Sequence, residues 1–74
     1  NPTTSITYAL PQSGSVTLKI FDILGKEVTT LVDEVKSAGV HSVIFNASTL
    51  PSGIYLYKIQ SGSFVEVKKM NLIK

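Results

Sequence analysis

The chain has 74 residues, 43% of them hydrophobic, with no cysteine and a formal net charge of +2. This length suffices for one small domain with a thin core, and the lack of cysteine excludes disulfide, zinc-thiolate and thiol redox chemistry. All basic residues are lysines, and most are scattered, so the basic stripe and arginines of nucleic-acid binders are missing and we expect no nucleic-acid partner. No apolar run approaches the roughly 20 residues of a membrane-spanning helix, so we expect no membrane span.

Two stretches in the first twenty residues alternate between apolar and polar side chains. The ranges 5–10 and 16–20 both have the period of two that is typical of a half-buried strand. The side chains expected to face the core are Ile6, Tyr8, Leu10, Val16, Leu18 and Ile20.

The next segment is ambiguous between helix and strand. A type I turn over 22–25, with Gly25 in the left-handed region, predicts a hairpin with a bulge. Within 26–35 the apolar residues fit a helical spacing, but the density of valine and threonine favours a strand. We therefore predict a strand over 27–32.

The second half predicts three more strands. In 40–46 the residues His41, Val43 and Phe45 share one face. The range 54–60 is apolar on both faces, which predicts a central strand covered on both sides. The last stretch, 64–73, has apolar residues in both phases, so either both faces are covered or a bulge near Lys68 and Lys69 switches them.

Turn signals about ten residues apart, with no room for a helix, predict an all-β fold. We expect a small Ig-like antiparallel β-sandwich of about seven short strands, occupying 1–74 as a single domain. The segment 50–57 adds a specific pointer, because Ig-like sandwiches place a tyrosine whose hydroxyl bonds back to the preceding corner. Tyr55 fits that role, while Gly25, Gly39 and Gly53 are expected to be structural turn residues.

Nothing in the sequence has the pattern of a catalytic or metal site. His41 is the single histidine and has no acid at ligand spacing, and no glycine-rich phosphate loop is present. A nucleophilic site needs a base and an orienting acid held together, and short loops cannot bury such a cluster. We therefore expect no enzyme activity, no cofactor, no metal and no catalytic residues.

Several motifs recur in an order and spacing that are specific when taken together. They are the segments 1–8, Leu10-Pro11, 16–28, Ala38-Gly39, 45–47, 50–55 and Lys69-Met70. In this order they resemble the C-terminal sorting domain of the bacterial type IX secretion system, in the type A form related to flagellar-hook-cap Ig-like domains. The resemblance covers essentially the whole chain, although related domains often carry a longer Asn-Pro-rich entry than Asn1-Pro2.

This resemblance implies an address label on an upstream cargo, read by the outer-membrane secretion machinery and usually removed by a sortase-like peptidase. It implies export through the periplasm to the cell surface or the extracellular space. The resemblance places the signal on Gly53, Tyr55, Lys69, Met70 and the tail through Lys74, and Lys68 and Lys69 would add electrostatic steering. The residues we expect to be recognised are Lys68, Lys69, Met70 and Lys74. A partner can capture a free terminal strand by strand addition, and it can hold a terminal carboxylate in a backbone nest.

Other hypotheses remain open. The chain begins with Asn1-Pro2 rather than methionine, so we expect it to be the C-terminal part of a longer secreted protein. A cleaved domain with free edge strands could also form homo-oligomers and filaments as an extracellular structural subunit. An accessory carbohydrate- or surface-binding module ranks third, because the chain has no tryptophan for a sugar platform. On bare sequence, the lysines of the last strand are more simply explained as protection of an exposed edge.

Overall fold

The computed structural model describes residues 3–73 and contains six strands and no helix in that range. In chain order these are β1 (Thr3–Leu10), β2 (Gly14–Asp22), β3 (Glu27–Lys36), β4 (Gly39–Asn46), β5 (Gly53–Ser61) and β6 (Phe64–Leu72). All pairings are antiparallel, as the alternating patterns predict. The all-β prediction is confirmed, with six strands in the described range where about seven were predicted.

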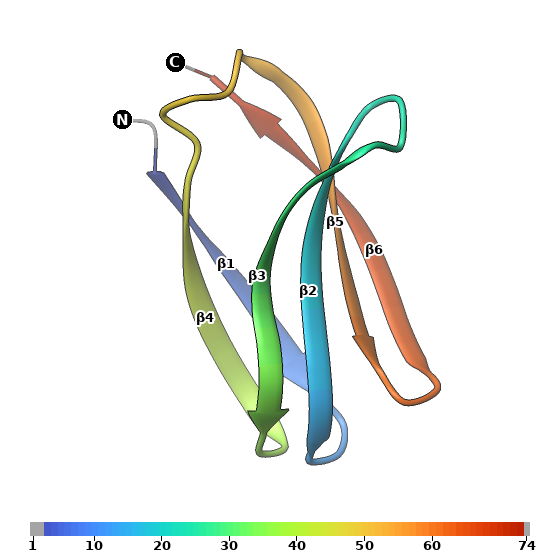
Figure 1. The fold of residues 1–74 in the computed structure, drawn as a ribbon. Coiled ribbons are helices and arrows are strands. Elements are labelled where there is room, and N and C mark those ends of the chain that lie inside the picture. The colour runs from blue at the N-terminus through green and yellow to red at the C-terminus, as the bar shows by residue number, and fades with distance from the viewer. Residues whose placement is uncertain (1–2, 74) are drawn as a thin grey trace.

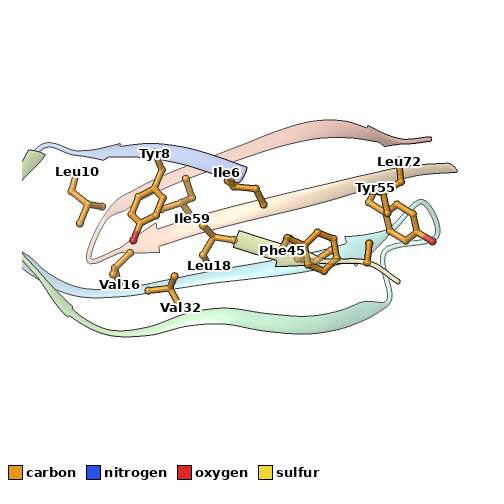
Figure 2. Close-up of a cluster of buried hydrophobic side chains, with 12 residues drawn as sticks. Ile6, Tyr8, Leu10, Val16, Leu18, Val32, Phe45, Tyr55, Ile59 and Leu72 are labelled. Carbon is orange, nitrogen blue, oxygen red and sulfur yellow. The ribbon is translucent and has the colours of Figure 1, made fainter. Parts of the chain in front are cut away.

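The strands form two sheets that face each other as a sandwich. One sheet has two strands in the order β1-β4, and the other has four in the order β3-β2-β5-β6 (Figure 1). The shared core draws side chains from all six strands (Figure 2). The buried residues are Ile6, Tyr8, Leu10, Val16, Leu18, Ile20, Val32, Phe45, Ala47, Tyr55, Ile59 and Leu72. The inward faces predicted for 5–10 and 16–20 are therefore confirmed.

Strand β3 explains the helical spacing seen in its sequence. Its pairing with β2 shifts register twice, so that Leu31 and Val28 are each an extra residue without a direct partner. Each shift changes which face the following residues occupy. As a result Val28 and Leu31 pack against the core together with buried Val32, while Val35 points outward and is exposed. The strand prediction for 27–32 is confirmed, and two bulges produced the misleading period.

The turn between β2 and β3 is held by one aspartate. The Asp22 carboxylate oxygen Oδ1 accepts hydrogen bonds from the backbone N–H groups of Leu24, at 3.0 Å, and Lys26, at 2.9 Å. The Gly25 N–H donates to the Asp22 carbonyl at 2.9 Å, and Gly25 has a φ of 87°. No atom lies within 4 Å of where a Gly25 side chain would begin, so its backbone angle rather than crowding calls for glycine.

Strand β5 is central, as predicted, because it pairs with both β2 and β6. The prediction that both of its faces are covered is wrong. Tyr55 and Ile59 face the core, whereas Ile54 on the opposite face is 37% exposed and Leu56 is half-buried. In residues 3–73 no second layer lies over this outer face of the four-stranded sheet.

The corner before β5 is closed by Tyr55. Its hydroxyl donates a 2.8 Å hydrogen bond to the carbonyl of Pro51, four residues earlier. This is the bond that the Gly-x-Tyr pattern predicts. Because the Tyr55 ring is buried in the core, the bond ties the 47–52 connection to the sandwich.

Substitution of the two isoleucines of β5 tests whether only one face of this strand is covered. We expect Ile59→Ala to lower the free energy of unfolding by about 2–5 kcal/mol, because Ile59 is 0% exposed and its loss leaves a cavity. Ile54→Ala is the matched control on the opposite face and should cost less than about 1 kcal/mol. Urea denaturation of both variants measures the difference. Equal costs would show that the outer face is covered in solution.

The tyrosine bond is tested by removing a single oxygen. Tyr55→Phe should lower the free energy of unfolding by about 0.5–1.5 kcal/mol, because it removes the bond to Pro51 and keeps the ring. Tyr57→Phe, at a half-buried ring on the same strand, is the control and should change stability less. Denaturation midpoints measure both, and equal midpoints would contradict the corner bond.

Candidate functional site

The last strand, β6, ends the four-stranded sheet. It pairs with β5 from Phe64 opposite Ser61 through to Leu72 opposite Gly53, with no shift in register. No bulge is therefore present near Lys68 and Lys69. Within the described residues β5 is its only partner, so the other side of β6 presents backbone N–H and C=O groups of the kind that accept an added strand.

The regular pairing explains why β6 has apolar residues in both phases. Phe64, Met70 and Leu72 lie on the core side, where Leu72 is buried and the other two are half-buried. Val65 and Val67 lie on the opposite face and are 49% and 55% exposed. Neither of the two alternatives for this strand is correct, because the pairing has no bulge and only one face is covered. Its second apolar face is open.

The structure separates the predicted recognition residues. Lys68 is on the core-side face of β6, where its Nζ lies 4.0 Å from a carboxylate oxygen of Glu66. Lys69 is on the outer face, directly opposite Leu56 of β5. Met70 packs against the core, and Lys74 lies outside the described residues. Lys68 and Lys69 therefore do not form one continuous basic patch.

A hollow of about 520 Å³ lies between the free edges of β1 and β6. Its walls include Tyr8 and Leu10 from β1 and Phe64, Glu66 and Lys68 from β6. Lys68 thus stands at an opening with apolar walls and two strand edges, which is a geometry that suits an extended peptide.

The four residues predicted to be structural lie in turns or behind β6. Gly25 is in the β2–β3 turn, and Gly39 begins β4 with a φ of 123°. Gly53 and Tyr55 lie directly opposite Leu72 and Met70 in the β5–β6 pairing. Through this pairing Gly53 and Tyr55 help to hold the end of β6 in place.

The ion pair with clear pKa shifts lies away from β6. On β3, Lys36 Nζ is 2.6 Å from Glu34 Oε1. This hydrogen bond, reinforced by the opposite charges, lowers the pKa of Glu34 and raises the pKa of Lys36. Glu34 is exposed and Lys36 is half-buried, and their charges balance each other, so this end of β3 presents a neutralised pair.

The described residues show no other type of site. Among residues 3–73 no group of three His, Asp or Glu side chains could hold a metal ion. His41 lies on β4, where its Nε2 is 2.8 Å from the Ser37 carbonyl and its ring is 5.6 Å from that of Tyr8. No helix in the described range is long and apolar enough to cross a membrane.

Sequence reasoning did not single out the outer face of β2, β5 and β6. Lys58 on β5 lies directly between Lys19 of β2 and Val67 of β6. The available signal is the apolar content of both phases, which predicts double coverage for 54–60 and either double coverage or a bulge for 64–73. An exposed apolar face interspersed with lysines gives the same pattern.

These features define a class of protein: a small two-layer all-β domain whose last described strand is an edge strand that pairs on one side only. The family described as the secretion system C-terminal sorting domain matches residues 1–74, and the chain belongs to this family. It is a sorting domain of the type IX secretion system, and a protein that carries it is exported to the cell surface or the extracellular space. No curated protein matches the chain.

The assignment of Lys69 and Met70 to opposite faces of β6 can be tested by their effects on stability. Met70→Ala should lower the free energy of unfolding by about 1–2 kcal/mol, because Met70 packs against the core. Lys69→Ala should change it by less than about 0.5 kcal/mol, because the side chain is exposed. Thermal or urea denaturation of the two variants gives the comparison. A larger loss for Lys69→Ala than for Met70→Ala would contradict the assigned faces.

Proposed function

We propose that the chain acts by binding, as a C-terminal signal that directs an upstream cargo through the type IX secretion system. The observation that carries this proposal is the family match over residues 1–74. The free edge of β6 supports it, because strand addition offers a partner a row of backbone hydrogen bonds without any chemistry. In this proposal the domain has no catalytic role.

The binding step has two parts. A strand of the outer-membrane machinery pairs with β6 at the hollow beside β1, and its apolar side chains contact Tyr8, Leu10 and Phe64. Lys68 and Lys69, on opposite faces of β6, steer the approach of an acidic partner. Met70 acts indirectly by fixing β6 on the core.

The later steps belong to the same proposal. The cargo crosses the periplasm with the domain attached, and a sortase-like peptidase then removes the domain.

A second candidate function is self-assembly into an extracellular filament. One observation favours it: within the described residues both sheets end in strands that pair on one side only. Such edges join readily to other strands. The lysines of β6 oppose this, because charged side chains on an edge strand repel identical copies.

Export can be tested without unfolding the domain. Deleting the whole tail from residue 69 would remove buried Leu72 and part of the β5–β6 pairing, so lost export would not distinguish recognition from folding. We therefore fuse residues 1–74 to a reporter with a periplasmic signal peptide, and compare it with Lys68→Ser, Lys69→Ser and a deletion of Lys74 alone. The control is Lys26→Ser, in the β2–β3 turn.

We expect the parent fusion and the Lys26→Ser control to reach the medium or the surface of a type IX-competent bacterium. Lys68→Ser and Lys69→Ser should slow export by about tenfold or less, because each removes one exposed steering charge. Periplasmic retention of the parent fusion would refute the sorting function. If the isolated domain also formed large assemblies at micromolar concentration by sedimentation, the filament function would replace it.

A further inference from the structure

The outer face of β2, β5 and β6 has aligned rows of apolar and basic side chains. In one row Phe21, Leu56 and Lys69 lie side by side, and in the next row Lys19, Lys58 and Val67 do the same. We call these six residues the lysine face. Val67 is exposed, and Phe21 and Leu56 are half-buried although no layer of the described structure covers them.

The charges of this face have one sign. On the outward positions of β2, β5 and β6 every charged side chain is a lysine. Lys19 Nζ lies 3.4 Å from Glu27 Oε1 on neighbouring β3. Within residues 3–73 no ion pair is formed by Lys58 or Lys69. The face therefore has two uncompensated positive charges beside exposed apolar groups.

The centre of the face holds two lysines side by side, of which Lys19 is balanced by Glu27 and Lys58 is not. Lys19 and Lys58 are directly opposite each other on β2 and β5, and like charges in this position destabilise a sheet. A hollow of about 450 Å³ lies over them and is also lined by Thr17, Gln60 and Phe21. A carboxylate placed in this hollow would relieve the repulsion and could accept hydrogen bonds from both ammonium groups.

The mixture of lysines and apolar side chains on the lysine face favours one kind of binding partner over two others. A second copy packed on this face through a two-fold axis would bring its own lysines to the same centre, so like charges would oppose the contact. A phosphate-rich polyanion would pair with the lysines but leave Phe21, Leu56 and Val67 exposed to water. A protein surface with carboxylates among aliphatic side chains satisfies both the charges and the apolar area.

We propose that the lysine face is a docking surface for a partner protein whose contact surface has Asp or Glu carboxylates among aliphatic side chains. As a contact made during export it rests on the proposed sorting function. It is a second contact, separate from strand addition at the β6 edge, because the backbone edge and the outer sheet face point in different directions. Lys58 is its central charged residue.

The export test uses two pairs of matched variants in the same fusion. Lys58→Glu and Val67→Ser alter the lysine face, and Val67 is 55% exposed. Lys26→Glu makes the same charge change in the β2–β3 turn, and Ile44→Ser removes an aliphatic side chain that is 64% exposed on β4 of the other sheet. We expect Lys58→Glu to slow export by about tenfold and Val67→Ser by a smaller factor, with both controls close to the parent. Circular dichroism and denaturation midpoints verify that each variant folds.

Two export results separate the failure of this inference from the failure of the sorting function. If the parent fusion is exported and folded Lys58→Glu is exported equally well, the docking inference is overturned and the sorting function stands. If the parent fusion is retained, the sorting function fails, and the docking surface is then decided by binding in solution.

The solution measurement follows amide NMR shifts in residues 1–74 during titration with a synthetic peptide that alternates glutamate and valine. We expect shifts centred on Lys58, Val67 and Lys69, lost in Lys58→Glu and reduced by high salt. A peptide alternating lysine and valine is the control and should give none. Shifts elsewhere, stronger binding to phosphatidylglycerol vesicles, or concentration-dependent dimers through this face would each overturn the inference.

Discussion

The two sheets pack face to face through a single layer of buried apolar side chains, and the rest of the structure depends on this layer. Strand β2 is at its centre, because it pairs with both β3 and β5 and contributes Val16, Leu18 and Ile20, all fully buried. Each such side chain stabilises the fold by about 1.5–3 kcal/mol relative to exposure. A chain of this size has too few residues to cover the outer face of either sheet as well, so both outer faces are open to water in the described structure. The candidate surfaces are a direct consequence of this thin core.

The sequence predicted best where one face alone is apolar. In β1 and β2 the alternation identified every buried residue, because most outward positions are polar and a one-residue slip would bury them. In β3 the apolar spacing was ambiguous between strand and helix, because the extra residues Val28 and Leu31 give a bulged strand the spacing of a helix. It also failed for the outer faces of β5 and β6, because composition does not distinguish an apolar face that is covered from one that is open. The Ig-like relationship remains an expectation from the resemblance.

The predicted recognition residues show the same limit. Sequence proximity grouped Lys68, Lys69 and Met70, but neighbouring residues in a strand point to opposite faces. The register against β5 was needed to place Lys69 beside Leu56 and to place Lys58 near it on the same face. No pattern in the sequence gives that pairing, because it depends on where the β5–β6 turn falls.

Strand β6 combines two roles that usually conflict. Leu72 is buried and Met70 packs against the core, so β6 contributes to stability, while its outer edge is free. A partner that adds a strand to β6 therefore recognises a folded domain, because an unfolded chain presents neither the aligned backbone groups nor the hollow beside β1. Recognition of this kind would report on folding as well as on identity.

Lysines on an open apolar face reconcile solubility with binding. In the free domain the aliphatic stem of Lys58 can cover neighbouring Val67 and that of Lys69 can cover Leu56, while the ammonium groups remain in water. The same charges repel an identical face, so they act against self-association. An acidic partner attracts these lysines instead of repelling them, and the aliphatic stems of Lys58 and Lys69 can stay packed on their neighbours. The discrimination between a copy and a partner then comes from charge alone, and it requires no rearrangement of the sheet beneath.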